Sequence, residues 1–120
     1  MTLRDALETL LATRGVRGLA VATVDGAVIE AVGRRAGDVE AVAGLVTGGL
    51  ASASALAALF GDGEVRQATL AYELGPVLLQ PIGDAPVGHV VVALLDDMEA
   101  LGRVRAAARR RLGELAEAAA

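Results

Sequence analysis

The feature that most constrains this chain is a run of twenty residues, 41–60, without a single charged side chain. Such a run has the length of a membrane-spanning helix. However, three glycines, two serines and a threonine interrupt its apolar residues, and its flanks are acidic at Asp38, Glu40 and Asp62. A membrane anchor favours Lys and Arg on its cytoplasmic side. We therefore expect 41–60 to form a buried helix of a globular protein that has no membrane partner.

The uncharged helix is expected to run from an N-cap at Asp38 to about Phe60. Within it, Gly44, Gly48 and Ser52 lie four residues apart and therefore share one stripe of the helix surface. Each glycine in a helix interior costs about 1 kcal/mol relative to alanine. Because small residues allow two helix backbones to approach closely, we expect another element to pack against this stripe.

The remaining hydrophobic patterns predict two further helices and five strands in the order αββαβββα. The expected elements are a helix from Thr2, a hairpin of 16–24 and 27–32, the uncharged helix, strands at 65–74, 77–82 and 88–95, and a last helix after Asp96 or Asp97. Asp25-Gly26 in the hairpin is typical of a tight turn in which both residues accept positive φ. Both faces of the strands are apolar, which indicates a sheet covered by helices on each side. We expect one α+β domain over 1–120.

Local signals mark the ends of the first and last helices. Thr2 is expected to cap the first helix, with Asp5 in its first turn. Asp96 and Glu99 have the spacing of a capping box at the start of the last helix. The tail 116–120 is expected to fray.

The reactive side chains are too few for an enzyme. Cysteine and lysine are absent and histidine occurs once, at His89, which excludes disulfides, thiolate metal sites, multi-histidine sites and lysine chemistry within one chain. No glycine-rich phosphate loop of the P-loop or dinucleotide type occurs in the sequence. The adjacent carboxylates Asp96 and Asp97 lack a third ligand for a divalent cation. We therefore expect no catalytic residue, no metal and no cofactor.

Charge is distributed unevenly along the chain. The net charge of −4 makes nucleic-acid binding unexpected, because phosphate contacts need a positive surface. No basic segment precedes an apolar run at the start, so we expect a cytoplasmic protein. The last helix nevertheless gathers five arginines: Arg103, Arg105, Arg109, Arg110 and Arg111. We interpret them as a solvated face that complements the helix C-terminus, with a patch for an acidic protein partner as the alternative and nucleic acid as a third.

Three short motifs occur in order: Val16-Arg17-Gly18-Leu19-Ala20-Val21, Asp25-Gly26-Ala27-Val28-Ile29 and Leu101-Gly102-Arg103-Val104-Arg105. They are similar to the first strand (G-V-x-G-apolar), the second strand (D-G-apolar) and the opening of the last helix (L-G) of the Roadblock family, named for a dynein light chain. Together with the order αββαβββα, the resemblance covers nearly the whole chain. It is strongest to the bacterial, MglB-like branch of polarity-control proteins.

This resemblance implies a five-stranded antiparallel sheet with the first and last helices on one face and the second helix on the other. It also implies a homodimer in which the third strands pair edge to edge and the second helices pack together. The residues expected at that interface are Gly44, Gly48, Ser52, Val65, Gln67 and Thr69.

The resemblance further implies a non-catalytic adaptor or regulator of a Ras-like small GTPase of the MglA type. Activation of hydrolysis would come from ordering the GTPase's own residues, not from an inserted arginine. The expected partner contacts are Glu64 and Arg66 near the dimer centre, with Arg103 and Arg109 as a second surface. MglB-like members often carry an extra C-terminal segment, whereas few residues follow Leu115 here. A structural scaffold without effect on hydrolysis is therefore the alternative, and a ligand-binding sensor module is the third.

Overall fold

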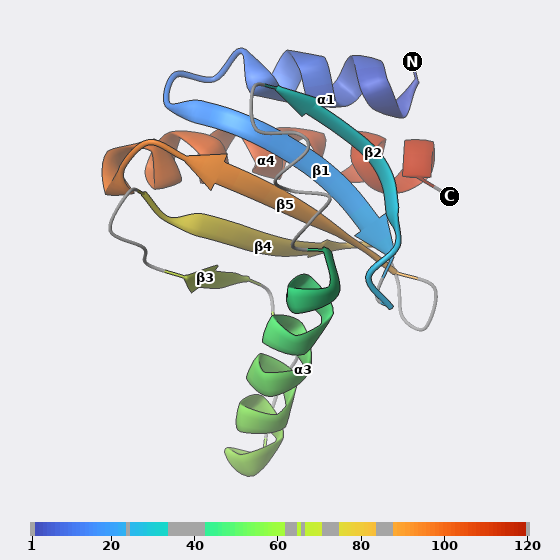
Figure 1. The fold of residues 1–120 in the computed structure, drawn as a ribbon, viewed down its shortest axis with the longest axis vertical. Helices are drawn as coiled ribbons and strands as arrows, with labels where there is room; N and C mark the ends of the chain where they lie inside the picture. The colour runs from blue at the N-terminus through green and yellow to red at the C-terminus, as the bar shows by residue number, and fades with distance from the viewer. Residues whose placement is uncertain are drawn as a thin grey trace.

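The computed structural model describes residues 2–23, 25–33, 43–61, 65, 67–70, 75–83 and 88–119, with the backbone alone at 43–47 and 112. Its strands are β1 (Val16–Thr23), β2 (Val28–Gly33), β3 (Ala68–Leu70), β4 (Val77–Ile82) and β5 (His89–Leu95), and its helices are α1 (Leu3–Leu11), α3 (Ala43–Leu59) and α4 (Met98–Ala119). The strands form one antiparallel sheet in the order β2-β1-β5-β4-β3, so that β5 is central (Figure 1). The α+β fold with helices on both faces is confirmed.

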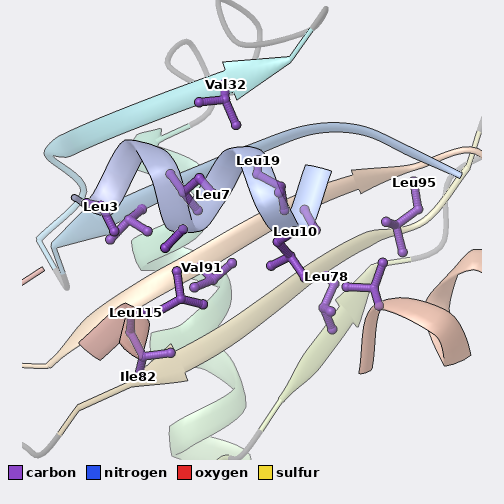
Figure 2. Packing of buried hydrophobic residues seen from close by; sticks show 14 of the residues in the cluster. Leu3, Leu7, Leu10, Leu19, Val32, Leu78, Ile82, Val91, Leu95 and Leu115 are labelled. Carbon is purple, nitrogen blue, oxygen red and sulfur yellow. The ribbon is translucent and has the colours of Figure 1, made fainter. Parts of the chain in front are cut away.

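The main core lies between the sheet and a layer formed by α1 and α4. Alternate residues of β5 point to this face, where Val91 and Leu95 pack with Leu7 and Leu10 of α1 and with Leu115 of α4 (Figure 2). Full burial of a side chain of this size stabilises the folded chain by about 2 kcal/mol. The first and last helices therefore share one face of the sheet, as predicted.

The opposite face of the sheet carries a smaller core. Val90 and Val92 of β5 are buried there beside Leu79 of β4. α3 contacts this core near the middle of the helix, where Leu50 packs against it and a Cβ on Gly49 would lie 3.2 Å from Leu79 Cδ1. From that contact α3 extends past the β3 edge of the sheet (Figure 1).

The prediction that 41–60 forms a buried helix is wrong for the described part of this segment. Leu56, Leu59 and Phe60 are 55%, 82% and 78% exposed, respectively. The physical reason is geometric, since α3 leaves the sheet after Leu50 and nothing else among the described residues covers it. Within the described part of the chain, no helix is long and apolar enough to cross a membrane.

The β1–β2 hairpin forms as predicted, but its turn is wider than expected. The backbone N–H of Thr23 donates to the Ala27 carbonyl at 2.8 Å. Gly26 has a φ of +95°, whereas Asp25 does not have a positive φ. The prediction of positive φ at both residues is therefore wrong at Asp25, because a longer loop needs only one left-handed residue.

α1 begins at the predicted cap. The backbone N–H of Asp5 donates to Thr2 Oγ1 at 3.1 Å, and the backbone N–H of Thr2 donates to Asp5 Oδ2 at 3.3 Å. The Thr2 side chain and then its backbone hydrogen-bond the Asp5 carboxylate and lower its pKa below the usual value. Both bonds help to satisfy donors that a helix N-terminus leaves unpaired.

β3 is shorter than the predicted strand 65–74. Val65 and Gln67 lie outside the strand, and residues 71–74 fall outside the described part of the chain. The pairing of β3 with β4 ends at Ala68 and Leu79. Pro81 follows shortly in β4, and because it lacks an N–H it cannot donate to a longer ladder.

α4 departs from two predictions. Asp97 is its N-cap, since the backbone N–H of Ala100 donates to Asp97 Oδ1 at 2.9 Å. Asp96 instead pairs with an arginine of β1, so the predicted capping box of Asp96 and Glu99 is wrong. The predicted fraying of 116–120 is also wrong as far as Ala119, because the helix continues to that residue and its last alanines pack partly buried against the main core.

Candidate partner-binding surfaces

The outer side of α3 is a surface of small and apolar residues, here called the α3 stripe. Its exposed members are Gly48, Ser52, Ala55, Leu56 and Leu59. Their spacings of three and four residues place them on one side of the helix. A Cβ built on Gly48 would meet no atom within 4 Å, and Gly44 lies one helical turn before it. The stripe is therefore open to another molecule as far as the described residues show.

The β3 edge lies beside α3, and none of the described strands pairs with its outer side (Figure 1). Thr69 and the preceding Val65 are half-buried, and Leu70 is 41% exposed. The side chain of Gln67 is used within the chain. Its Nε2 donates to Gln80 Oε1 at 3.1 Å, and its Oε1 accepts from Nε of an α4 arginine, Arg105, at 2.5 Å. These contacts direct the Gln67 side chain to β4 and α4.

The other outer strand, β2, is less suited to pairing with another chain. Val21 pairs with Glu30 while Ala22 pairs with Val28, so Ile29 is the extra residue of a β-bulge. Glu30 also accepts a hydrogen bond from Arg4 Nη1 of α1 at 2.8 Å. Bulges and charged side chains protect sheet edges from strand addition. β3 is therefore the better candidate for an edge-to-edge contact.

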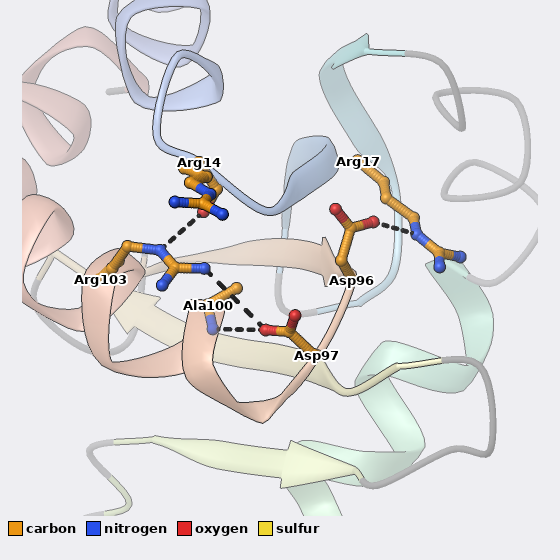
Figure 3. Close-up of polar contacts among 6 residues, drawn as sticks. All are labelled: Arg14, Arg17, Asp96, Asp97, Ala100 and Arg103. Carbon is orange, nitrogen blue, oxygen red and sulfur yellow. Dashed lines mark hydrogen bonds and ion pairs between the residues drawn. The ribbon is translucent and has the colours of Figure 1, made fainter.

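Of the predicted partner contacts, Glu64 and Arg66 lie outside the described residues. Arg103 is described, and its side chain is held within the chain (Figure 3). Its Nε donates to the Arg14 carbonyl at 3.0 Å, and its Nη2 lies 4.0 Å from Asp97 Oδ1. Arg103 therefore ties the start of α4 to the turn between α1 and β1. Sequence spacing alone could not show this bond, because its partners lie 89 residues apart.

A second ion pair at this end of the sheet uses a β-bulge in β1. Val16 pairs with Leu95 and Gly18 with Leu94, which makes Arg17 the extra residue. Its Nε lies 2.6 Å from Asp96 Oδ1, on the opposite side of β5 from the Arg103 contact (Figure 3). Both Asp96 and Asp97 are thus engaged, which agrees with capping and pairing rather than with cation binding.

Arg109 stands apart from Arg103 on the outer side of α4. Arg109 and Arg110 are exposed, and neither forms a hydrogen bond or ion pair with the residues that the structure describes. The helix continues to Ala119, and its last turn contains no basic residue. A helix dipole acts mainly on its last turn. The prediction that these arginines complement the helix C-terminus is therefore wrong, while their placement on an exposed face agrees with the structure.

The described residues do not assemble a catalytic or metal site. His89 lies half-buried at the start of β5, opposite Thr23 of β1. The Thr23 hydroxyl is used in the hairpin, where it hydrogen-bonds Asp25 and accepts from the Ala27 N–H. Among these residues no three acidic or histidine side chains converge on a metal position, and no polar side chain is buried. That the protein is not an enzyme stays a prediction.

A five-stranded sheet in this order, with α1 and α4 on one face and α3 on the other, defines a Roadblock-type domain. The Roadblock/LC7 domain model matches residues 2–94. The chain therefore belongs to the Roadblock/LC7 domain family.

Solved structures agree with this assignment. The gliding protein MglB from Thermus thermophilus is 23% identical, with a TM-score of 0.82 over 97% of this chain and 87% of that chain. MglB from Myxococcus xanthus is 21% identical, with a TM-score of 0.82 over 96% of this chain and 92% of that chain. An MglB with a tetrameric arrangement is 22% identical, with a TM-score of 0.82 over 97% and 86%. These likenesses establish the fold. No curated protein sequence matches the chain significantly.

Proposed function

We propose that this protein is a non-catalytic homodimeric regulator or adaptor of a Ras-like small GTPase of the MglA type. Membership of the Roadblock/LC7 domain family and the likeness to MglB structures support this function. The observation that carries it is the open α3 stripe beside the unpaired β3 edge. Such a surface suits a protein partner, since large exposed apolar patches mark interaction sites.

In the proposed homodimer, a two-fold axis relates two copies through the same surface. The β3 edges pair through their backbones, with Val65, Gln67 and Thr69 at or near the edge. The α3 helices approach closely at Gly44, Gly48 and Ser52, and the stripe's exposed leucines supply apolar area. The tetrameric arrangement of one MglB supports self-association.

A regulator of this kind needs no catalytic group of its own. Hydrolysis by Ras-like proteins depends on positioning the attacking water and stabilising charge, so a partner can accelerate it by ordering the GTPase. We propose Glu64, Arg66 and Arg109 as contacts, with Arg103 acting by holding the start of α4. We further propose that the protein works in the cytoplasm without a cofactor and without a nucleic-acid or membrane partner.

Titration calorimetry against each Ras-like GTPase of the same genome tests this function, with the GDP form and a GTP-analogue form measured separately. We expect binding that differs between the two forms and weakens with salt, because exposed charges are screened beyond about 8 Å in physiological buffer. Arg66→Glu should weaken binding if the contact lies near the dimer centre, and Arg109→Glu if it lies on α4. Arg4→Glu is the control on α1.

Two results would decide against a GTPase regulator. Absence of binding to every such GTPase in both nucleotide forms contradicts the proposed function. Binding without any change in the rates of hydrolysis or nucleotide exchange favours the structural scaffold.

A further inference from the structure

The outer side of α4 carries arginine side chains whose charge the described residues do not compensate. Arg105, Arg109 and Arg110 are all exposed. Arg105 donates to the neutral amide oxygen of Gln67, and the other two form no hydrogen bond or ion pair with the described residues. Arg105 and Arg109 are four residues apart, a spacing at which like charges destabilise a helix. In a chain with a net charge of −4, this face is therefore a local concentration of positive charge.

Small residues form a ridge between these arginines. Gly102, Ala106 and Gly113 are exposed and recur at intervals of four and seven residues, which places them along one line of the helix. A Cβ built on Gly102 or Gly113 would meet no atom within 4 Å. Glycine weakens a helix interior, and neither glycine is required by a neighbouring group among the described residues. The ridge lets a second backbone come close while the arginines reach around it.

We propose that this outer face of α4 is a docking site for an acidic α-helix of a partner protein. The partner helix would pack on the ridge of Gly102, Ala106 and Gly113, which extends over about 16 Å. Its carboxylates would bind Arg109 on one side and Arg110 on the other. Guanidinium groups bind carboxylates through paired hydrogen bonds, which gives both affinity and orientation.

A second copy of this chain fits the face poorly. An antiparallel α4 centred on the ridge would place Arg105 of one copy opposite Arg110 of the other, and a parallel one would align the same arginines. Either arrangement brings like charges together, which disfavours association.

An anionic membrane fits the face poorly as well. A helix that binds a membrane surface inserts an apolar face between the lipids. Of the described side chains of α4, Met98 is the only large exposed hydrophobic one. Glu99 and Glu117 lie exposed beyond the two ends of the ridge, where a flat anionic surface along the whole helix would meet both, whereas carboxylates placed between them would not.

The proposed site lies on the other side of the sheet from α3 (Figure 1). An acidic helix bound to α4 would therefore leave the α3 stripe and the β3 edge free for the proposed second copy of this chain. This inference stands whether or not the protein also binds a GTPase.

Site-specific photocrosslinking in the protein's own cells tests the site. The crosslinker p-benzoylphenylalanine replaces Met98, which is 57% exposed beside the ridge, and the adduct is identified by peptide mass spectrometry. The same crosslinker at Ala27, exposed in the hairpin turn, gives the background. We expect the adduct at Met98 to map to an acidic helix of another protein.

Three variants of the Met98-labelled protein show whether the arginines and the ridge cause the adduct. Arg109→Gln with Arg110→Gln should reduce it about tenfold or more, the loss expected for one charge-assisted hydrogen bond. Gly113→Leu should reduce the adduct similarly, because a large side chain on the ridge keeps the partner helix away. Arg4→Gln with Arg14→Gln makes the same change in net charge elsewhere and should leave the adduct unchanged. Circular dichroism of each variant confirms that the fold is retained.

Four results would overturn the docking site. They are no adduct above the Ala27 background, an adduct to a second copy of this chain, an adduct to lipid, and an adduct that survives both the double arginine variant and Gly113→Leu. An adduct to a protein other than a GTPase supports the site and leaves the proposed regulation of a GTPase to the calorimetry.

Discussion

Replacing Gly48 by leucine should change the stability of the single chain and the affinity of the dimer in opposite directions. Within one chain, a side chain at Gly48 enters open space, because a Cβ there meets no atom within 4 Å. In the proposed dimer, the same position lies where two helices approach most closely. The substitution should therefore raise the melting temperature of the monomer and raise the dissociation constant of the dimer.

The expected gain in the single chain comes from helix propensity. Leucine is favoured over glycine in a helix interior by about 0.8 kcal/mol. For a chain of this size, that gain raises the melting temperature by about 4 °C. The comparison must be made at a concentration at which both proteins are monomeric, since dimerisation itself stabilises the folded state.

The expected loss in the dimer comes from overpacking. An added side chain in a packed interface costs about 1–3 kcal/mol, and the two-fold axis repeats the clash in both copies. The dissociation constant should therefore rise by a factor on the order of 10² or more. Sedimentation equilibrium over a range of concentrations measures this change directly.

The neighbouring glycine provides the matched control. A Cβ on Gly49 would lie 3.2 Å from Leu79 Cδ1, so Gly49→Leu should destabilise the single chain instead of strengthening it. An unchanged dimer constant for Gly48→Leu would refute the α3 contact. A wild-type protein that stays monomeric at tens of micromolar would refute the dimer altogether.

Three further substitutions test the structure at single sites, each by its melting temperature and denaturant unfolding. Gly75→Ala should destabilise the chain by about 3 kcal/mol or more, because Gly75 has a φ of +136° and a Cβ would lie 2.0 Å from the Leu95 carbonyl oxygen; a stable variant would contradict this geometry. Asp97→Ala should cost about 1 kcal/mol through the lost N-cap and Asp96→Ala less, since its exposed ion pair contributes little; the reverse order would place the cap at Asp96. The lowered pKa of Asp5 stabilises the folded chain above the pKa of the unfolded state, and this contribution disappears as the pH falls through the folded-state pKa. The melting difference between wild type and Asp5→Ala should thus be largest near neutral pH and shrink below about pH 4; a pH-independent difference would contradict it.

Features encoded by a few neighbouring residues could be predicted from the sequence. Thr2 and Asp5 form the predicted start of α1, and Gly26 turns the predicted hairpin, because both structures depend on contacts within a few residues. The choice between Asp96 and Asp97 as the cap of α4 depends on Arg17, which lies 79 positions away and binds Asp96. No local signal contains that information.

The error at α3 has a different physical cause. The apolar, uncharged composition of α3 predicts that the helix is buried. The sequence does not show whether it is buried against the chain's own sheet or against another molecule. The structure shows that Leu50 packs against the sheet and that Leu59 is exposed. Spacing predicts that Gly48 and Ser52 share one side of the helix, whereas the exposure of that side depends on the direction of α3.

The arginines of α4 also show what a sequence leaves open, namely which polar side chains are used within the fold. All five appear equivalent in the sequence, yet Arg103 holds the α1–β1 turn, Arg105 holds Gln67, and Arg111 lies 3.3 Å from Glu114. Only Arg109 and Arg110 remain without a contact among the described residues. A binding site predicted from charge alone therefore mixes arginines that stabilise the fold with arginines that are available to a partner.

The two faces of the sheet divide stability and association between them. Among the described residues, the α1–α4 face contributes sixteen buried members to its core and the α3 face four. Since burial of apolar area is the main source of folding free energy, most of the described core that stabilises the fold lies on the α1–α4 side, away from the exposed α3 stripe. The same division explains why the ridge of α4 tolerates two glycines and adjacent arginines. Leu101, Val104 and Leu115 anchor the inner side of α4 in the core. The helix can therefore tolerate destabilising residues on its outer side, where we propose that a partner binds.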